Sequence, residues 1–281
     1  MGGKQTLKID AIGYWSEVKL DIIRDYAHEY SRILSAQTSP SLKHVYIDGF
    51  AGAGIHFSRR SKDIVPGSPS NALMVHPPFK EYYFVDLNPG RAESLKSMSL
   101  GHQNVHVFEA DCNHVLLERV FPNVRYEQYR RGLCLLDPYG LHLEWKAIHT
   151  AGQMRSIEIF LNFPVADMNR NVFWRNPEGV DPADIRRMNA FWGDESWRDV
   201  VYTDMPNLFG SEQVKTDNET VAKAFQERLR SVAGFAYVPD PVPMRNDQGA
   251  TVYYLFFASQ KPVAKKIVEH IFSKYRNIGA I

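Results

Sequence analysis

The sequence has very few cysteines and no long hydrophobic run. Cys112 and Cys134 are the only two cysteines among 281 residues, and their wide separation excludes a CxxC pair, a zinc-type spacing and a disulfide framework. We expect Cys134, which lies within an apolar run, to be a small buried core residue. No apolar segment approaches the ~20 residues that a membrane-spanning helix needs, and the N-terminus lacks the hydrophobic segment of a signal peptide. These absences favour a soluble, cytoplasmic protein with no metal site and no membrane contact.

The chain also lacks an excess of either charge. It carries 33 Lys and Arg against 32 Asp and Glu, for a formal net charge of +1. This balance excludes a protein wholly dedicated to binding a polyanion, so any contact with nucleic acid must be a local patch. The hydrophobic fraction of 44% and the aromatic fraction of 12% are sufficient for a buried core. We therefore expect a folded α/β protein that forms a single domain over residues 1–281.

The most informative stretch is residues 45–54. The apolar run at 45–47 ends at Asp48, and Gly49, Gly52 and Gly54 follow it. This pattern is typical of a buried parallel strand that opens onto a tight loop, where glycine permits positive φ and close approach of a ligand. A carboxylate at the strand end would repel a dinucleotide pyrophosphate, but it suits a cationic cofactor such as S-adenosylmethionine. The stretch therefore favours a site for that cofactor over one for a nicotinamide dinucleotide.

Two further apolar runs, at 81–86 and 104–108, predict strands that also lead to an acid. Asp86 could accept hydrogen bonds from both hydroxyls of a ribose, each contributing about 1.5–3 kcal/mol. The alternative is an ordinary N-cap of the helix that follows. Asp111 could accept from the exocyclic amine of an adenine, and the alternative is again a cap, for a helix at 113–120. The repetition of strand-end acids favours the functional interpretation of both residues.

The fourth predicted strand, 132–136, leads into Asp137-Pro138-Tyr139-Gly140. In a doubly wound sheet the first and fourth strands lie side by side at the point where ligands bind. Asp137 would then face Asp48 and its glycines across a crevice. Tyr139 could stack on a planar substrate, whereas the alternative is a merely structural Asp-Pro turn.

The segments around these motifs complete a single domain. Residues 15–35 predict an amphipathic helix. Lys19 in this helix could approach a cofactor carboxylate, but we expect it to be solvated. Residues 55–66 predict a polar, basic loop. A helix begins at Gly67-Ser68-Pro69, where Ser68 can serve as its cap. A fifth strand, 156–164, carries Asn162 near its end.

Residues 165–215 change character and predict a helical insertion over the strand ends, with helices near 182–192 and 195–203. Arg170 is among its candidate anion contacts. The rest of the chain predicts a helix at 218–231, a terminal β-hairpin and a closing helix at 262–275. The hairpin pairs strands at 235–238 and 252–257, and the core of the domain comprises residues 43–164 and 216–281.

The order of these motifs resembles class I S-adenosylmethionine-dependent methyltransferases and, more narrowly, the three-Cys-motif partner protein (TcmP) family. The likeness rests on residues 19–23, 47–52, 67–69 and 136–140. It implies a Rossmann-like fold with about seven strands, mostly parallel, and an antiparallel terminal hairpin. It also implies S-adenosylmethionine as the cofactor and a three-Cys-motif, radical-SAM-like protein as a partner.

The turn at 137–140 is similar to the Asp/Asn-Pro-Pro-Tyr signature of amino-methyltransferases, which act on adenine or related amines. In those enzymes the acid and the first proline carbonyl accept from the amine, while the aromatic ring stacks on the base. Asp137 and Pro138 match this signature. The second proline is missing, so Tyr139 arrives one position early.

We therefore predict a methyltransferase that acts on an amine of a nucleobase in RNA or DNA. Its catalytic candidates are Asp137, Pro138 and Tyr139, and its substrate-binding candidates are Asn162 and Arg170. The predicted cofactor-binding residues are Asp48, Gly49, Phe50, Gly52, Gly54, Asp86, Leu87, Asp111 and Cys112. The alternatives are a small-molecule or nucleoside methyltransferase, a cofactor-binding accessory module that acts with its partner protein, and a nicotinamide oxidoreductase.

Overall fold

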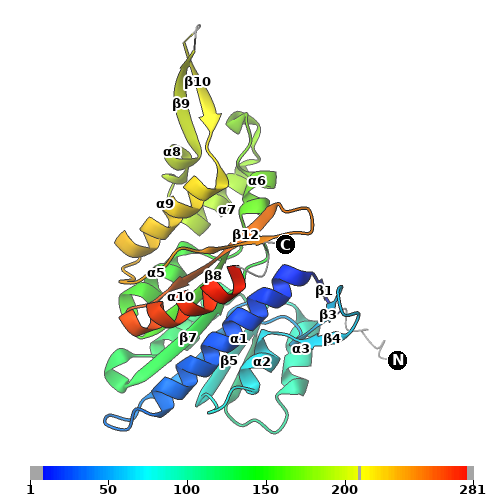
Figure 1. Ribbon diagram of the computed structural model, residues 1–281, viewed down its shortest axis with the longest axis vertical. Helices are drawn as coiled ribbons and strands as arrows, with labels where there is room; N and C mark the ends of the chain where they lie inside the picture. The colour runs from blue at the N-terminus through cyan, green and yellow to red at the C-terminus, as the bar shows by residue number, and fades with distance from the viewer. Residues whose placement is uncertain (1–8, 208–209, 277–281) are drawn as a thin grey trace.

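The computed structural model describes residues 9–207 and 210–276, and its centre is a seven-stranded sheet (Figure 1). Five strands of this sheet run parallel: β2 (Lys43–Asp48), β5 (Glu81–Asp86), β6 (Val105–Glu109), β7 (Arg130–Leu136) and β8 (Ile157–Phe163). Two antiparallel strands complete it, β11 (Val242–Arg245) and β12 (Thr251–Ala258). The strand order is β11-β12-β8-β7-β2-β5-β6, so β2 and β7, the first and fourth of the predicted strands, are neighbours. This topology confirms the predicted fold class.

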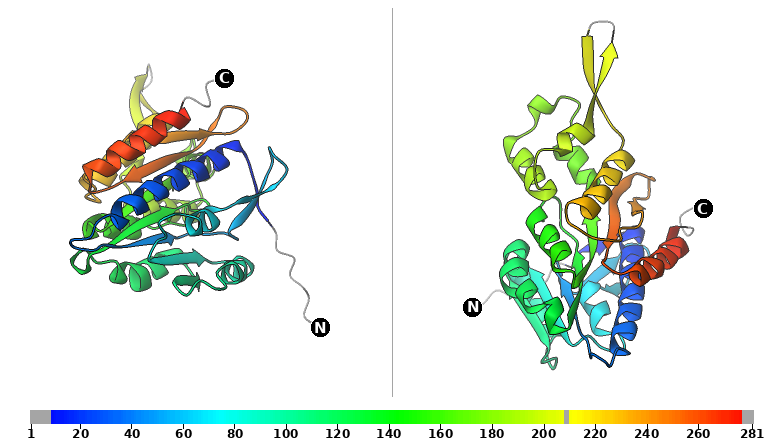
Figure 2. Two further views of the ribbon diagram at one scale, coloured as in Figure 1. Left: turned by 60° about the horizontal axis from the view of Figure 1, so that its bottom comes forward. Right: turned by 90° about the vertical axis from the view of Figure 1, so that its left-hand side faces the viewer.

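Helices cover both faces of the sheet (Figure 2). One face packs against α1 (Tyr14–Ser35), α2 (Ser68–Leu73), α3 (Pro89–Met98) and α10 (Pro262–Arg276). The other face packs against α4 (Cys112–Val115), which continues as the π-helical turn η1 (Leu116–Val120), and against α5 (Trp145–Met154). Alternate residues of one strand serve the two layers: Tyr46 points into the first, Val45 and Ile47 into the second. Short 3-10 turns complete the connections: η2 (Phe121–Asn123), η3 (Tyr126–Gln128) and η4 (Pro177–Gly179).

The predicted loop at 55–66 is instead a small β-sheet. Strands β3 (Ile55–Ser58) and β4 (Ile64–Pro66) pair antiparallel, and β1 (Ala11–Ile12) pairs parallel with β3. The basic residues that suggested a loop occupy only the turn, where Lys62 has a φ of 62°. The Ser58 hydroxyl stabilises this turn by accepting from two backbone N–H groups. The prediction was wrong because β3 and β4 have only four and three residues, too few for their apolar pattern to stand out beside the charged turn.

The insertion at 165–215 is only partly helical. It contains α6 (Val165–Asn171), α7 (Pro182–Trp192) and α8 (Trp197–Val201), followed by a hairpin of β9 (Tyr202–Asn207) and β10 (Gly210–Lys215). The hairpin projects from the body of the molecule (Figure 1). The predicted helix near 182–192 is confirmed, and the one near 195–203 ends at Val201. The hairpin that follows was not predicted, because polar residues and Pro206 in the β9 sequence obscure a strand pattern.

The terminal hairpin is confirmed, but its first strand was predicted in the wrong place. Residues 235–238 make only an isolated bridge between Tyr237 and Ser259. The strand beside β12 is β11, which lies beyond the prolines at 239 and 241 and itself contains Pro243. A proline is tolerated there because β11 is an edge strand and needs hydrogen bonds on one side only.

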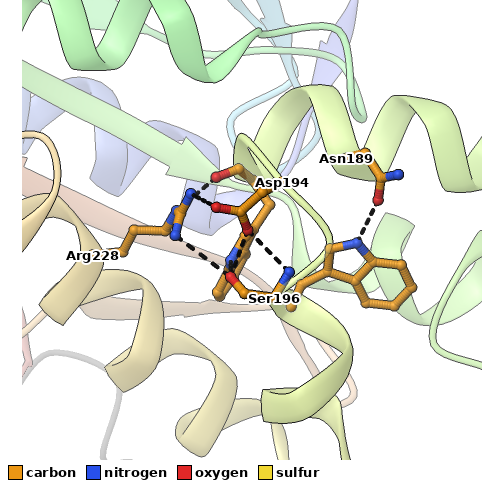
Figure 3. A network of polar contacts seen from close by, with 6 residues as sticks. Asn189, Asp194, Ser196 and Arg228 are labelled. Carbon is orange, nitrogen blue, oxygen red and sulfur yellow. Dashed lines mark hydrogen bonds and ion pairs between the residues drawn. The ribbon is translucent and has the colours of Figure 1, made fainter.

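A polar network joins the insertion to α9 (Asn218–Ser231) (Figure 3). The Arg228 guanidinium donates to the Trp192 carbonyl at 2.7 Å and to the Asp194 carboxylate at 2.6 Å. Its Cζ also lies 4.7 Å from the centre of the Trp145 ring, on α5. Arg228 therefore ties the end of α7 to two helices of the core.

Among the described residues, no helix is both long and apolar enough to cross a bilayer.

We expect Arg228→Met to lower the free energy of unfolding by about 1–3 kcal/mol. Methionine keeps the aliphatic part of the side chain, but it leaves the Trp192 carbonyl and the Asp194 carboxylate without their donor. Urea denaturation measures this change. The control is Lys223→Met on the same helix, whose ion pair with Glu219 is exposed and should contribute little. Equal effects of the two substitutions would contradict the anchoring role of Arg228.

Candidate functional site

A cavity of about 1100 Å³ opens at the carboxyl ends of the parallel strands. Its wall is formed by the segments that follow β2, β5, β6, β7 and β8, together with α1 and part of β12. The predicted site residues that line it are Gly49, Phe50, Gly52, Asp86, Leu87, Asp111, Cys112, Asp137, Pro138, Tyr139, Asn162 and Arg170. Segments far apart in the sequence thus converge on one cavity because parallel strands present their carboxyl ends at the same edge of a sheet.

The glycine loop contributes to the cavity through Gly49 and Gly52. Gly52 has a φ of +65° and no heavy atom within 4 Å of where a Cβ would lie, so the backbone there borders open space. A Cβ on Gly49 would lie 2.7 Å from the Cys112 Sγ. Glycine at position 49 therefore lets the Cys112 side chain pack against the backbone of the loop.

Gly54 does not reach the cavity, although it was predicted to bind the cofactor. Its φ is +82°, and an added Cβ would lie 2.9 Å from the Met98 Sδ. Its carbonyl accepts from the Gly67 N–H and the Ser70 hydroxyl. The third glycine thus serves the packing of α2 and α3.

Asp86 faces the cavity with its carboxylate held by backbone donors. One oxygen accepts from the Gly52 N–H at 2.9 Å and the other from the Asn88 N–H at 2.8 Å. Asn88, not Asp86, caps α3, so the capping alternative is wrong for Asp86. Each carboxylate oxygen can accept more than one hydrogen bond, which leaves acceptor capacity on the cavity side. The Arg91 guanidinium is 3.9 Å from this carboxylate and pairs with Asp10 at 2.5 Å.

Asp111 caps α4 and also lines the cavity. One carboxylate oxygen accepts from the His114 N–H at 3.0 Å, so the capping interpretation is confirmed for this acid. Next to it, Cys112 is buried, and burial raises the pKa of its thiol well above the ordinary range. A neutral thiol is therefore part of the wall. Leu87 is 71% exposed and lies on the rim.

Lys19 lines the cavity, although the sequence favoured a solvated side chain over one that approaches a cofactor carboxylate. It was expected to be solvated, but it is buried and forms an ion pair with the Asp137 carboxylate. Its Nζ also lies 5.2 Å from the centre of the Tyr253 ring. Burial lowers the pKa of Lys19, but Asp137 and then Tyr253 raise it above its ordinary value, so the ammonium stays charged. The helical periodicity did indicate that Lys19 lies on the buried face of the helix, because Lys19 is spaced three and four residues from the buried Ile22 and Ile23.

Asp48 lies beneath the cavity and not on its wall. Its side chain is fully buried; one oxygen accepts from the Phe50 N–H at 3.3 Å, and the other has no hydrogen-bond partner among the described residues. Burial raises the pKa of Asp48 to about 7, the Ser68 hydroxyl opposes this, and Asp137 adds to it. The prediction that Asp48 contacts a cofactor directly is therefore not supported by its position.

The acceptor side of the cavity carries Tyr139 and Asn162. Tyr139 is 90% exposed, so its ring is accessible at the rim. Asn162 is 8% exposed, and its Oδ1 is a buried acceptor without a partner among the described residues. Such an atom is a place where a ligand N–H would be stabilised. Arg170 is exposed on α6, and its carbonyl accepts from the Trp174 indole.

The wall mixes charges of both signs. Lining residues that were not among the predicted site residues include Lys19, His56, Arg59, Arg91 and Asp167. Burial lowers the pKa of His56, and Lys19 lowers it further, so this imidazole is held neutral. The cavity is therefore suited to a ligand that itself carries both signs. Among the described residues, no group of three or more His, Cys, Asp or Glu side chains could hold a metal ion.

No protein-family model matches the chain, and no curated protein matches its sequence. Among solved structures, protein LPL1258 from Legionella pneumophila strain Philadelphia 1 is 13% identical, with 92% of this chain and 93% of that chain covered and a TM-score of 0.52. A putative methyltransferase from Thermobifida fusca YX is 16% identical, with 88% and 80% covered and a TM-score of 0.45. A SAM-dependent methyltransferase from Aquifex aeolicus is 14% identical, with 87% and 96% covered and a TM-score of 0.33. The likeness to LPL1258 spans nearly all of both chains and shows a shared fold.

We expect Asp48→Asn to stabilise the protein increasingly as pH rises from about 4 to about 8. Because the folded-state pKa of about 7 exceeds the ordinary value of 3.8, the folded protein binds more protons in this window and loses stability as pH rises through it. Asparagine removes this titration, and the gain over the wild type should reach roughly 2–4 kcal/mol. Urea denaturation across the pH range measures it. The exposed Asp63→Asn is the control, and a gain that does not change with pH would contradict the buried, raised carboxyl.

Proposed function

We propose that this protein is an S-adenosylmethionine-dependent methyltransferase. The observation that carries the proposal is that Asp86, Asp111 and Asp137 line one cavity with the Gly52 turn. Asp86 ends β5, and the other two acids come just after β6 and β7. The cavity lies at the junction of β2 and β7, where doubly wound sheets bind their ligands. Its mixture of acids and cations suits a cofactor that has a nucleoside at one end and a zwitterionic amino acid at the other.

The residues present fit that cofactor. Asp86 is oriented by two backbone N–H groups and retains acceptor capacity for the two hydroxyls of a ribose. Asp111 uses one oxygen as a helix cap, and its other oxygen can accept from an adenine amine. Lys19 is a buried cation on the wall that can attract the cofactor's carboxylate, and the open space at Gly52 admits its amino-acid end. When bound, the cofactor supplies a methyl group on a sulfonium, which is electrophilic toward an amine.

The task left to the protein is to position the acceptor. Asp137 is held in one orientation by Lys19, and its second carboxylate oxygen together with the Pro138 carbonyl can accept from an amine. Asn162 Oδ1 offers another buried acceptor in the same cavity. Alignment of donor and acceptor of this kind can lower a barrier by roughly 7–11 kcal/mol.

We further propose that the acceptor is an amine of a nucleobase in RNA or DNA. The exposed Tyr139 ring beside Asp137 supports this, because a planar base can stack on it while its amine reaches the carboxylate. A cavity of about 1100 Å³ exceeds what one small ligand usually fills, so there is room for an acceptor beside the cofactor. A free nucleoside or another small molecule is the alternative acceptor.

The second candidate function is a cofactor-binding module that acts with a partner, namely the three-Cys-motif, radical-SAM-like protein that the likeness to the TcmP family implies. The projecting hairpin of β9 and β10 supports this candidate, because a two-stranded ribbon has unpaired edges on which another protein can dock. Under this proposal the protein would bind the cofactor alone and transfer a methyl group only in the complex.

We expect S-adenosylhomocysteine to bind the wild type, and Asp86→Ala to weaken binding about 10- to 100-fold because the ribose hydroxyls lose their acceptors. Isothermal titration calorimetry measures both affinities. The matched control is Glu109→Ala, since Glu109 also ends a strand but does not line the cavity. A wild type that gives no binding heat, or an Asp86 variant that binds as tightly as wild type, would refute the cofactor assignment.

We expect labelled methyl groups to be transferred to nucleic acid when RNA, DNA and metabolite pools are offered separately. Asp137→Ala should lower turnover about 100-fold or more, because the amine loses its acceptor, while S-adenosylhomocysteine still binds. Tyr139→Ala should mainly raise KM, and Tyr139→Phe should restore it.

Each result of this assay discriminates between the candidates. Label in metabolites alone favours the small-molecule alternative, and label that requires the added three-Cys-motif protein favours the accessory module. Unchanged turnover of the Asp137 variant would remove this residue from the chemistry.

A further inference from the structure

A second cavity, of about 320 Å³, lies at the opposite edge of the sheet. The starts of β7 and β8, the last turns of α1 and the segment around η3 form its wall. Arg131 is the second residue of β7, and Asp137 follows the end of the same strand. At roughly 3.3 Å per residue the two are about 20 Å apart. The two cavities are therefore separate sites.

Three cations line this second cavity: Arg131, Arg155 and Lys261. The only carboxyl group among the residues that line it is Glu158, which accepts from the Tyr26 and Ser259 hydroxyls. Burial raises the pKa of Glu158, and its hydrogen bonds and Lys261 oppose this only in part. The Arg155 side chain makes no hydrogen bond or ion pair among the described residues. Positive charge at this cavity is thus not fully balanced.

Aromatic residues accompany the cations. The Arg131 guanidinium lies 3.6 Å from the centre of the Tyr126 ring, and the Lys261 Nζ lies 5.6 Å from it. Lys261 and then Arg131 lower the pKa of the Tyr126 hydroxyl, which reflects the positive potential. Tyr129 is 52% exposed and its ring makes no aromatic or cation contact among the described residues, so one aromatic face is available.

One of the residues that line the cavity carries a buried hydroxyl without a partner. Tyr30 is buried, lines the cavity, and its hydroxyl makes no hydrogen bond among the described residues. Burial raises the pKa of Tyr30 well above its usual range, so the group is a neutral donor. A buried donor without an acceptor is unfavourable unless a ligand or water supplies one.

The backbone is also unusual at this place. Tyr129 has a φ of 58° and Arg155 a φ of 57°, and the only other non-glycine residue with positive φ in the described ranges is Lys62. Both residues are C-caps, of η3 and α5 respectively, a position where left-handed backbone is common but is usually taken by glycine. Here it sets the two side chains on the wall of the same cavity.

We propose that this cavity binds a nucleoside monophosphate. Its phosphate would lie among Arg131, Arg155 and Lys261 and accept from the Tyr30 hydroxyl, and its base would stack on Tyr129. The volume lies at the lower limit of the range for small-ligand sites, about 300–1000 Å³, which suits a ligand with one phosphate. This proposal is independent of the proposed methyltransferase activity.

Calorimetry with uridine 5′-monophosphate tests the proposal, because the first cavity is suited to adenine. The titrations are made with and without saturating S-adenosylhomocysteine, so failure of the cofactor to bind leaves the second site measurable. We expect Lys261→Gln to weaken nucleotide binding about tenfold or more, and Tyr30→Phe about three- to tenfold. At high salt the loss caused by Lys261→Gln should diminish, whereas the loss caused by Tyr30→Phe should not.

Two matched controls isolate the site. Lys266→Gln removes an exposed cation on α10 that does not line the cavity. Tyr46→Phe removes another buried hydroxyl without a partner, also outside the cavity. Both should bind the nucleotide like the wild type.

Uridine and inorganic phosphate are titrated separately and should each bind at least tenfold more weakly than the nucleotide. The proposal is overturned if the wild type does not bind the nucleotide, if the Lys261 and Tyr30 variants bind like the controls, or if phosphate alone binds as tightly.

Discussion

The cavity depends on the ion pair between Lys19 and Asp137. It joins the first helix to the residue that follows the fourth parallel strand, and both groups are largely removed from solvent. Neither charge could remain there alone, because an unpaired ion in such a setting is strongly destabilising. The pair therefore holds α1 against the strand ends, where α1 forms one side of the cavity. It also keeps a carboxylate in a defined orientation beside Pro138 and Tyr139.

The strand-end acids differ in how each is stabilised, and this difference separates their roles. Asp86 is held by backbone N–H groups, Asp111 by the first turn of α4, and Asp137 by a lysine. Asp48 has one backbone donor at 3.3 Å and an orphaned oxygen, and its pKa is raised accordingly. An acid that is already satisfied by the protein and open to the cavity is suited to ligand binding. An acid that is buried without sufficient hydrogen-bond donors destabilises the folded protein and is poorly placed to bind a ligand.

The sequence predicted β2, β5, β7 and β8 well because these strands are largely buried and read as apolar runs. It also predicted the wall, since residues directly after parallel strands must lie at one edge. It failed where distant residues change the usual environment of a side chain. A lysine on a helix is usually solvated, but Lys19 is buried because it pairs with Asp137, which lies 118 positions away in the sequence. Asp48 and Gly54 were assigned to the ligand from a motif, but only tertiary packing decides which members of that motif reach the cavity. Short strands such as β3 and β10 were missed because polar turn residues outweigh a pattern of a few apolar side chains.

The position of β12 between β8 and β11 has a consequence for biosynthesis. During translation the five parallel strands leave the ribosome first, and β8 then has an open edge that only β12 can cover. Although β11 is made earlier than β12, it contacts the sheet solely through β12 and must wait for it. A nascent chain stalled before residue 251 would thus present an uncovered strand edge, the kind of surface that chaperones bind and through which aggregation proceeds.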